Sequence, residues 1–194
     1  MVKTNARLSL GCAAAVCFLL GSSGCLVEEA QEEAQDGEAS QVDWTVAEDL
    51  SPTAWSGWVS EELPNLECSS GNLIRGGECS GSYCDNIRVD CSGVAGSFGN
   101  AYWTTFFSDE GASNYRNCGP KHWVTGIDCS GSWCDNLSLE CTEVTNRSVG
   151  ACYWSSWYSE ENGAFQAPYG YYVRGIACGG SYCDNLQYYY CKLL

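Results

Sequence analysis

Three Asp-Asn pairs have side chains that could take part in binding chemistry. They are Asp85-Asn86, Asp135-Asn136 and Asp184-Asn185, at the end of a phrase that the chain repeats as CSGSYCDN, CSGSWCDN and CGGSYCDN. Their oxygens could bind sugar hydroxyls or a Ca²⁺ ion. The same side chains also accept hydrogen bonds from nearby backbone N–H groups and thereby hold turns in place. The structural interpretation is favoured, and Asp85, Asp135 and Asp184 are the candidate polar ligands.

A second set of carboxylates recurs with the same period, as Glu61-Glu62, Asp109-Glu110 and Glu160-Glu161. Solvated turns explain these pairs, and Ca²⁺ binding is the alternative. Catalysis has little support, because His122 is the only imidazole and no G-x-S-x-G, H-E-x-x-H or phosphate-binding loop occurs. We therefore expect a protein that is not an enzyme, with no cofactor apart from the Ca²⁺ alternative.

The cysteines form a second repeating pattern. Each copy of the phrase holds two cysteines separated by four residues, which a turn can bring within disulfide reach. The predicted local bridges are Cys79–Cys84, Cys129–Cys134 and Cys178–Cys183. The remaining cysteines of the first two units then pair as Cys68–Cys91 and Cys118–Cys141. Zinc is the competing use, but export and a single histidine argue against it.

The third unit departs from this pattern. Ala167 stands where a cysteine is expected, the spare cysteine is Cys152, and the final strand holds one extra residue before Cys191. One inserted residue turns the closing cysteine to the opposite face of a strand unless a bulge absorbs it. We therefore predict that the displaced partner and the changed register belong together, as a Cys152–Cys191 bridge.

The elements that position these residues are strands. Apolar and polar residues alternate in Ile87-Arg88-Val89-Asp90-Cys91 and again in 137–141, and no apolar stripe with helical spacing follows Asp49. The predicted fold is all-β and disulfide-rich, with pseudo-threefold units at about 51–98, 99–149 and 150–194. Two closed threefold folds accommodate units of this length, a type I β-prism and a β-trefoil.

The order of segments in each unit supports the prism. WSGW, WTTF and WSSW open the units, a loop with Cys and Gly follows, and DNIRVDC and DNLSLEC close the first two. This order resembles the vitelline membrane outer layer protein family, over about residues 51–194. The resemblance implies a type I β-prism with pseudo-threefold symmetry and the lectin-like use of such folds. The extra cysteine pair in each unit departs from that family.

Aromatic residues are numerous, with 8 Trp and 12 Tyr. Trp55, Trp103 and Trp154 share one repeat position and are expected to pack inside. Trp58, Phe106 and Trp157 lie three residues further on, so they are expected on the outer face, where rings can stack on sugars. The third unit adds further candidate ligand residues, of which Tyr169, Tyr171 and Tyr189 are the chief ones.

The N-terminal region predicts export. Residues 1–24 resemble a signal peptide with a basic start, an apolar stretch and small residues before Cys25. Lipidation of Cys25 leaves twelve cysteines in three sets of four, so a bacterial outer-membrane or cell-surface lipoprotein is expected; plain secretion is the alternative. Residues 26–50 hold nine acidic residues and no basic one, which predicts a disordered tether.

The net charge of the chain limits the classes of partner that it can bind. The net charge is −15 and no Lys/Arg cluster exists, which disfavours nucleic acid and anionic membrane surfaces. The expected function is an exported carbohydrate-binding or envelope-glycan-binding module, attached to a membrane only through its lipid. The alternative is a structural protein of an outer layer or matrix, with no small ligand.

Overall fold

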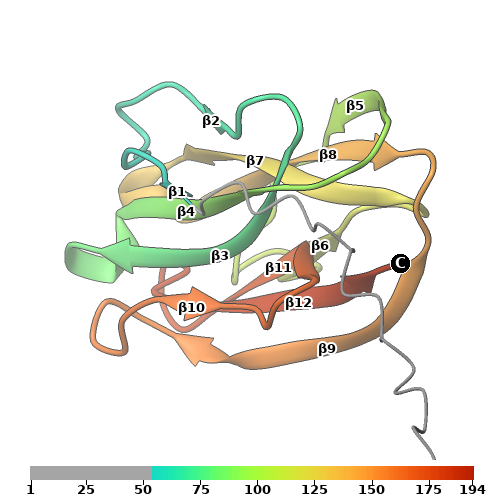
Figure 1. Cartoon of the computed structure of the whole chain (residues 1–194). Helices are drawn as coiled ribbons and strands as arrows, with labels where there is room; N and C mark the ends of the chain where they lie inside the picture. The colour runs from blue at the N-terminus through green and yellow to red at the C-terminus, as the bar shows by residue number, and fades with distance from the viewer. Residues whose placement is uncertain (1–53) are drawn as a thin grey trace, which may run out of the picture. The chain divides into compact units, whose positions relative to one another are not determined.

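The computed structural model describes residues 54–194, which form three antiparallel sheets of four strands each (Figure 1). Sheet 1 has the order β1 (Ala54–Trp55), β4 (Asn86–Gly93), β3 (Asn72–Ser80) and β10 (Phe165–Gln166). Sheet 2 has the order β2 (Leu66–Glu67), β7 (His122–Ser130), β8 (Asn136–Val144) and β5 (Phe98–Trp103). Sheet 3 has the order β6 (Tyr115–Asn117), β11 (Tyr171–Gly179), β12 (Asn185–Leu193) and β9 (Val149–Tyr158).

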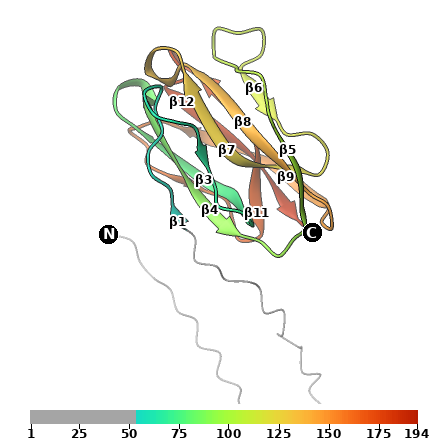
Figure 2. The ribbon, with the colours of Figure 1, turned by 90° about the horizontal axis from the view of Figure 1, so that it is seen from above.

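The three units exchange one strand in a closed cycle. The first unit gives β2 to sheet 2, the second gives β6 to sheet 3, and the third gives β10 to sheet 1. The all-β, pseudo-threefold part of the prediction is confirmed, and the choice of a prism stays a prediction. The same sheets are seen from above in Figure 2.

A glycine in each long strand makes this exchange possible. Gly76, Gly126 and Gly175 follow a one-residue bulge in β3, β7 and β11. A Cβ atom at any of the three would collide with a backbone oxygen of the donated strand. Glycine is therefore required at these three positions by the close approach of the donated strand.

The sheets enclose one main core, and its packing departs from threefold symmetry at Tyr188 and Gly77. Tyr188 of β12 is buried where the other units have Val89 and Leu139. Its ring fills the space that a side chain at Gly77 would need, whereas the other units have Ile127 and Ile176 at that position. A larger residue in one sheet is thus matched by a smaller one in another.

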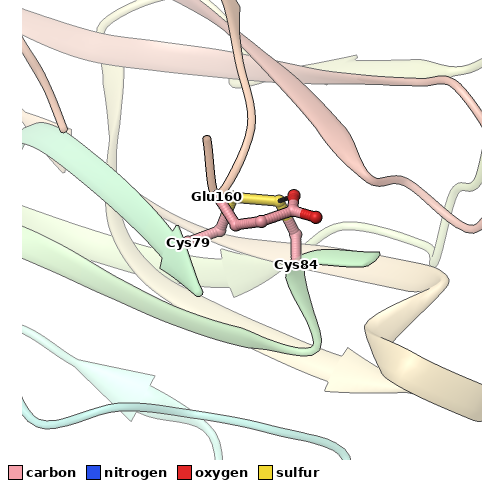
Figure 3. Close-up of side chains that lie close together, drawn as sticks. All are labelled: Cys79, Cys84 and Glu160. Atoms are coloured by element: carbon pink, nitrogen blue, oxygen red, sulfur yellow. Dashed lines mark hydrogen bonds between the residues drawn. A yellow bond between two sulfur atoms is a disulfide. The ribbon is translucent and has the colours of Figure 1, made fainter. Parts of the chain in front are cut away.

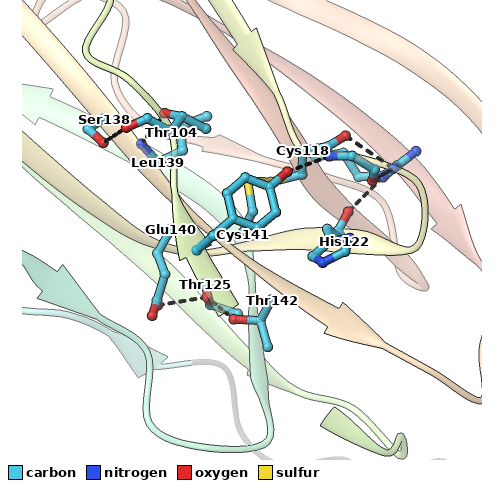
Figure 4. The surroundings of a disulfide bond; sticks show 12 residues. Thr104, Cys118, His122, Thr125, Ser138, Leu139, Glu140, Cys141 and Thr142 are labelled. Atoms are coloured by element: carbon cyan, nitrogen blue, oxygen red, sulfur yellow. Dashed lines mark hydrogen bonds between the residues drawn. A yellow bond between two sulfur atoms is a disulfide. The ribbon is translucent and has the colours of Figure 1, made fainter. Parts of the chain in front are cut away.

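All six predicted disulfide pairings are confirmed. Cys68 lies beside β7 of sheet 2 and bonds to Cys91 of sheet 1, so this bridge staples two sheets together. Cys118 and Cys141 staple sheets 3 and 2 in the same way, as Figure 4 shows with its surroundings.

We call each line along which two sheets meet a seam. Among the described residues, no disulfide crosses the third seam, between sheets 1 and 3. Ala167 occupies the place of Cys68 and Cys118, with its N–H donating to the backbone oxygen of Arg75 at 2.9 Å. Phe165 of β10 closes this seam by stacking on Tyr188 at a ring distance of 4.8 Å and packing on Tyr158 and Tyr190. Aromatic packing therefore replaces a covalent bond here.

The extra residue of β12 explains the displaced cysteine. Tyr190 pairs with Val173, the position that Cys91 and Cys141 hold in their own sheets, and Cys191 pairs with Tyr172 one place further on. Cys191 thereby moves into a second small core with Leu73 and Trp123. It bonds to Cys152, which lies directly opposite on β9. The prediction that partner and register change together is confirmed.

Strands β5 and β9 begin at Phe98 and Val149, each one residue before a predicted unit boundary. The predicted signal peptide, the lipidated Cys25 and the acidic tether lie outside the described residues. Within residues 54–194, no helix is long and apolar enough to cross a membrane. Six disulfides indicate an extracellular or otherwise exported protein.

Candidate functional site

The outer faces of the three sheets each carry a pair of aromatic residues. Trp58, Phe106 and Trp157 are exposed, as predicted. The prediction that Trp55, Trp103 and Trp154 pack inside is wrong. Trp103 and Trp154 are 36% and 40% exposed, and Trp55 is half-buried.

The reason is that the first strand of each unit does not alternate regularly. In β9, Trp157 pairs with Gln187 and Trp154 pairs with Tyr189, so the two residues between them oppose Tyr188 alone. This bulge at Ser155 and Ser156 places both tryptophans on the outer face. The serine hydroxyl at 155 accepts the backbone N–H of Tyr188 at 2.9 Å and holds the bulge. Val59, Phe107 and Tyr158 face the core instead.

Four aromatic residues lie on the outer face of sheet 3, and we call this surface the sheet 3 wall: Tyr115, Trp154, Trp157 and Tyr189. Tyr115 comes from one edge of the sheet and Trp154 from the other, and their rings meet edge to face at 6.2 Å. Trp154 also packs against Tyr189 at 5.0 Å. Trp157 lies over Gly179, where any larger residue would collide with its ring.

Polar side chains flank these rings. Gln187 lies opposite Trp157 and donates to the backbone oxygen of Ser155 at 2.7 Å. Asn117 reaches over Gly175, in the same row of paired residues as Tyr189 and Trp154. The wall therefore offers ring faces next to amide groups, which is the combination that a sugar requires.

Two of the predicted tyrosines are not part of this wall. Tyr171 packs on Tyr153 and Tyr190 on the opposite face of sheet 3. Tyr169 precedes β11 in an exposed turn. The run of tyrosines in β12 is divided between faces by strand alternation, so that Tyr188 is buried and only Tyr189 joins the wall.

The other two outer faces differ from sheet 3. On sheet 1, the guanidinium of Arg88 lies over both Trp55 and Trp58, at 4.9 and 4.7 Å from the ring centres. The same arginine donates to Glu78 at 2.7 Å, so these rings are already engaged with a cation. On sheet 2, Trp103 and Phe106 hold the same positions, and Ser138 replaces the arginine.

The outer face of sheet 2 also holds a partly buried carboxylate. The hydroxyl of Thr125 donates to Glu140 at 2.8 Å and contacts that of Thr142 at 2.6 Å (Figure 4). Burial raises the pKa of the Glu140 carboxyl above its usual value, and the negative charge of Glu67 adds to this rise. A single partly buried carboxyl of this kind does not form an acid and base pair.

The tight loops show what the Asp-Asn pairs do. Oδ1 of Asp85 accepts a hydrogen bond from the Asn86 amide at 2.6 Å and occupies the space that a Cβ atom at Gly81 would need. Gly81 also has a φ of 82°, which favours glycine. The other two loops repeat this arrangement. Asp85, Asp135 and Asp184 are half-buried and lie in the loops rather than among the wall rings. These contacts are those of a clamp that holds the loop.

The acidic turns link each loop to a neighbouring unit. Glu61 accepts the backbone N–H of Trp133 at 3.1 Å, and Asp109 accepts that of Cys183 at 3.2 Å. Glu160 completes the cycle beside the Cys79–Cys84 bridge, with one oxygen 3.7 Å from the Cys84 sulfur (Figure 3). Because both sulfurs are bonded to each other, this group offers no thiolate to a metal ion.

Sequence reasoning missed one aromatic group, formed by Tyr83, Trp133 and Tyr182 at the centre of the three tight loops. Their rings contact one another at 5.2 to 5.8 Å and are 38% to 43% exposed. The signal was present, because each loop places one aromatic residue just before its second cysteine. No family model, curated protein or solved structure matches this chain.

Proposed function

We propose that this protein is an exported module that binds carbohydrate or envelope glycan through the sheet 3 wall and performs no catalysis. The observation that carries the proposal is the exposure of Tyr115 and Trp154, whose rings meet across the outer face of sheet 3. Burying these two rings in the core would stabilise the fold. Because they are exposed instead, the surface favours a ligand.

The wall suits a sugar better than a basic or an anionic ligand. Its rings are flanked by the amides of Gln187 and Asn117, and Tyr189 stands where sheet 1 has Asp90 and sheet 2 has Glu140. Neutral amides beside ring faces match the hydroxyls and C–H faces of a sugar. The lectin-like use of prism folds, which the family resemblance implies, agrees with this proposal.

The test is a screen of soluble glycans against the oxidised protein, followed by calorimetry with the best of them. Trp154→Ala should weaken binding by about tenfold or more, because a central aromatic anchor commonly contributes over about 1 kcal/mol. Trp103→Ala, at the same repeat position on sheet 2, is the matched control and should bind normally. Equal loss in both variants, or no glycan bound by the wild type, would contradict the proposal.

The second candidate is a structural protein of an outer layer, favoured by six disulfides in 141 described residues. It predicts resistance to proteases and no small ligand. In either case we propose that the chain is a lipoprotein anchored through Cys25. Mass spectrometry of the mature N-terminus in the native host would show the acylated cysteine.

A further inference from the structure

The end of the domain formed by the three tight loops presents an aromatic cluster that the proposed function does not use. We call it the apex cluster: Tyr83, Trp133 and Tyr182. Each ring contacts the other two, and two of the three contacts are edge to face. A cluster that contains one ring from each unit lies on the pseudo-threefold axis, so it is the central feature of this end of the domain.

The backbone under these rings has a conformation that bulky residues rarely adopt. The φ angles of Tyr83, Trp133 and Tyr182 are 61°, 58° and 61°, and the cysteine after each also has a positive φ. A hydrogen bond from the Asp85 N–H to the Ser82 oxygen closes the first loop, as in a type I′ turn. Such turns favour Asn-Gly, which would fold here with less strain.

Three strained aromatic residues are therefore kept at exposed positions where folding would favour small ones. Backbone strain of this kind is a feature of binding and switching sites, and here it presents rings rather than hiding them. Clusters of Trp and Tyr surrounded by polar groups are also the usual centre of a protein interface.

The tight loops and the acidic turns that contact them carry negative charge only. The three tight loops and the three acidic turns contribute nine carboxylates and no basic residue. Oε1 of Glu61 and Oδ1 of Asp109 each accept a backbone N–H from a neighbouring loop, which holds these carboxylates close to the apex cluster. A surface with aromatic faces at its centre and carboxylates around it is complementary to a guanidinium, which stacks on rings and donates to carboxylates.

We propose that the apex cluster and its ring of carboxylates form an interaction surface for an arginine-containing segment of a basic protein partner. Arginine suits this surface better than lysine, because the planar guanidinium can stack on the rings while its N–H groups reach the carboxylates. The surface lies at the loops, whereas the sheet 3 wall lies on the outer face of β6, β9 and β12. The two sites can therefore be tested separately.

The probe is a hexa-arginine peptide, titrated into the oxidised full chain by calorimetry at 150 mM salt. Hexa-citrulline has the same shape without the charge, and hexa-lysine has the charge without the planar group. We expect hexa-arginine to bind about tenfold more tightly than hexa-lysine, and hexa-citrulline not to bind. Equal binding of the two basic peptides would show only general attraction to an acidic protein and would overturn the proposal.

Two variants test whether the rings of the apex cluster bind the peptide. Trp133→Asn removes the ring but keeps a residue that tolerates positive φ, so the loop should still fold. It should weaken hexa-arginine binding by about tenfold, whereas Trp154→Ala on the sheet 3 wall should leave it unchanged. Thermal unfolding of each variant checks that the fold is retained.

The carboxylates are tested by Glu61→Gln with Asp109→Asn, which should weaken hexa-arginine binding by about fivefold. The control is Glu67→Gln with Glu143→Gln, which removes the same charge at positions away from the tight loops and should have much less effect. Equal loss in the two double variants, or normal binding by Trp133→Asn, would overturn the proposal. Loss of glycan binding in Trp133→Asn would assign the apex to sugar instead.

Discussion

At the scale of single residues, the broken symmetry of the core rests on Tyr188 and Gly77. The ring of Tyr188 occupies the volume that a side chain at Gly77 would need. Gly77→Ile should therefore destabilise the protein by about 1–3 kcal/mol through overpacking. Tyr188→Leu should cost about 2 kcal/mol by leaving a cavity. The double variant copies the second unit and should recover at least about 1 kcal/mol of the summed loss. Urea unfolding under oxidising conditions measures this coupling, and strictly additive losses would show that the two sites do not share one space.

Glu140 gives a second prediction at this scale, for pH. Because burial raises its pKa in the folded protein, the folded state binds this proton more tightly than the unfolded chain. The stability that this proton contributes is present at low pH and is lost as the pH rises above about 4.5. Glu140→Gln should therefore lose less stability than the wild type between pH 4 and pH 7, as measured by urea unfolding. Glu110→Gln, in an exposed turn, is the control, and identical pH profiles for all three proteins would refute the argument.

At the scale of the elements, the donated strands are the connections between sheets, and two of the three are stapled. Cys68–Cys91 and Cys118–Cys141 each span 23 residues. Ala167 and Tyr190 hold the equivalent positions in the third unit and are also 23 residues apart (190 − 167). Ala167→Cys with Tyr190→Cys should form a third staple. The added bridge should contribute about 3 kcal/mol, offset in part by the lost packing of Tyr190 on Phe165. Thiol counting shows whether the bridge forms, and the two single variants should gain no stability.

At the scale of the whole molecule, the three seams should not open equally. The seam between sheets 1 and 3 is closed by Phe165 and its aromatic neighbours, without a covalent bond across it. The amides of Cys68, Cys118 and Ala167 make equivalent hydrogen bonds of 2.8, 2.7 and 2.9 Å across their seams. Hydrogen exchange at Ala167 should nevertheless be at least about tenfold faster than at the other two, which corresponds to an opening free energy lower by about 1.4 kcal/mol. Equal protection at the three amides would mean that aromatic packing holds its seam as firmly as a disulfide.

The sequence by itself determined the repeat, the strands, the tight loops and all six disulfide pairings, including Cys152–Cys191. Each of these follows from local spacing, because alternation, turn length and a one-residue insertion act within one unit. Only the tertiary structure decided which face Trp154 occupies and which rings meet. A bulge at Ser155 and Ser156 turned Trp154 outward, and no periodicity reveals a bulge held by a cross-strand hydrogen bond. Tyr83, Trp133 and Tyr182 meet only when the exchange of β2, β6 and β10 closes the cycle of three units. Contacts between units depend on that closure, so a reading of one unit at a time could not find them.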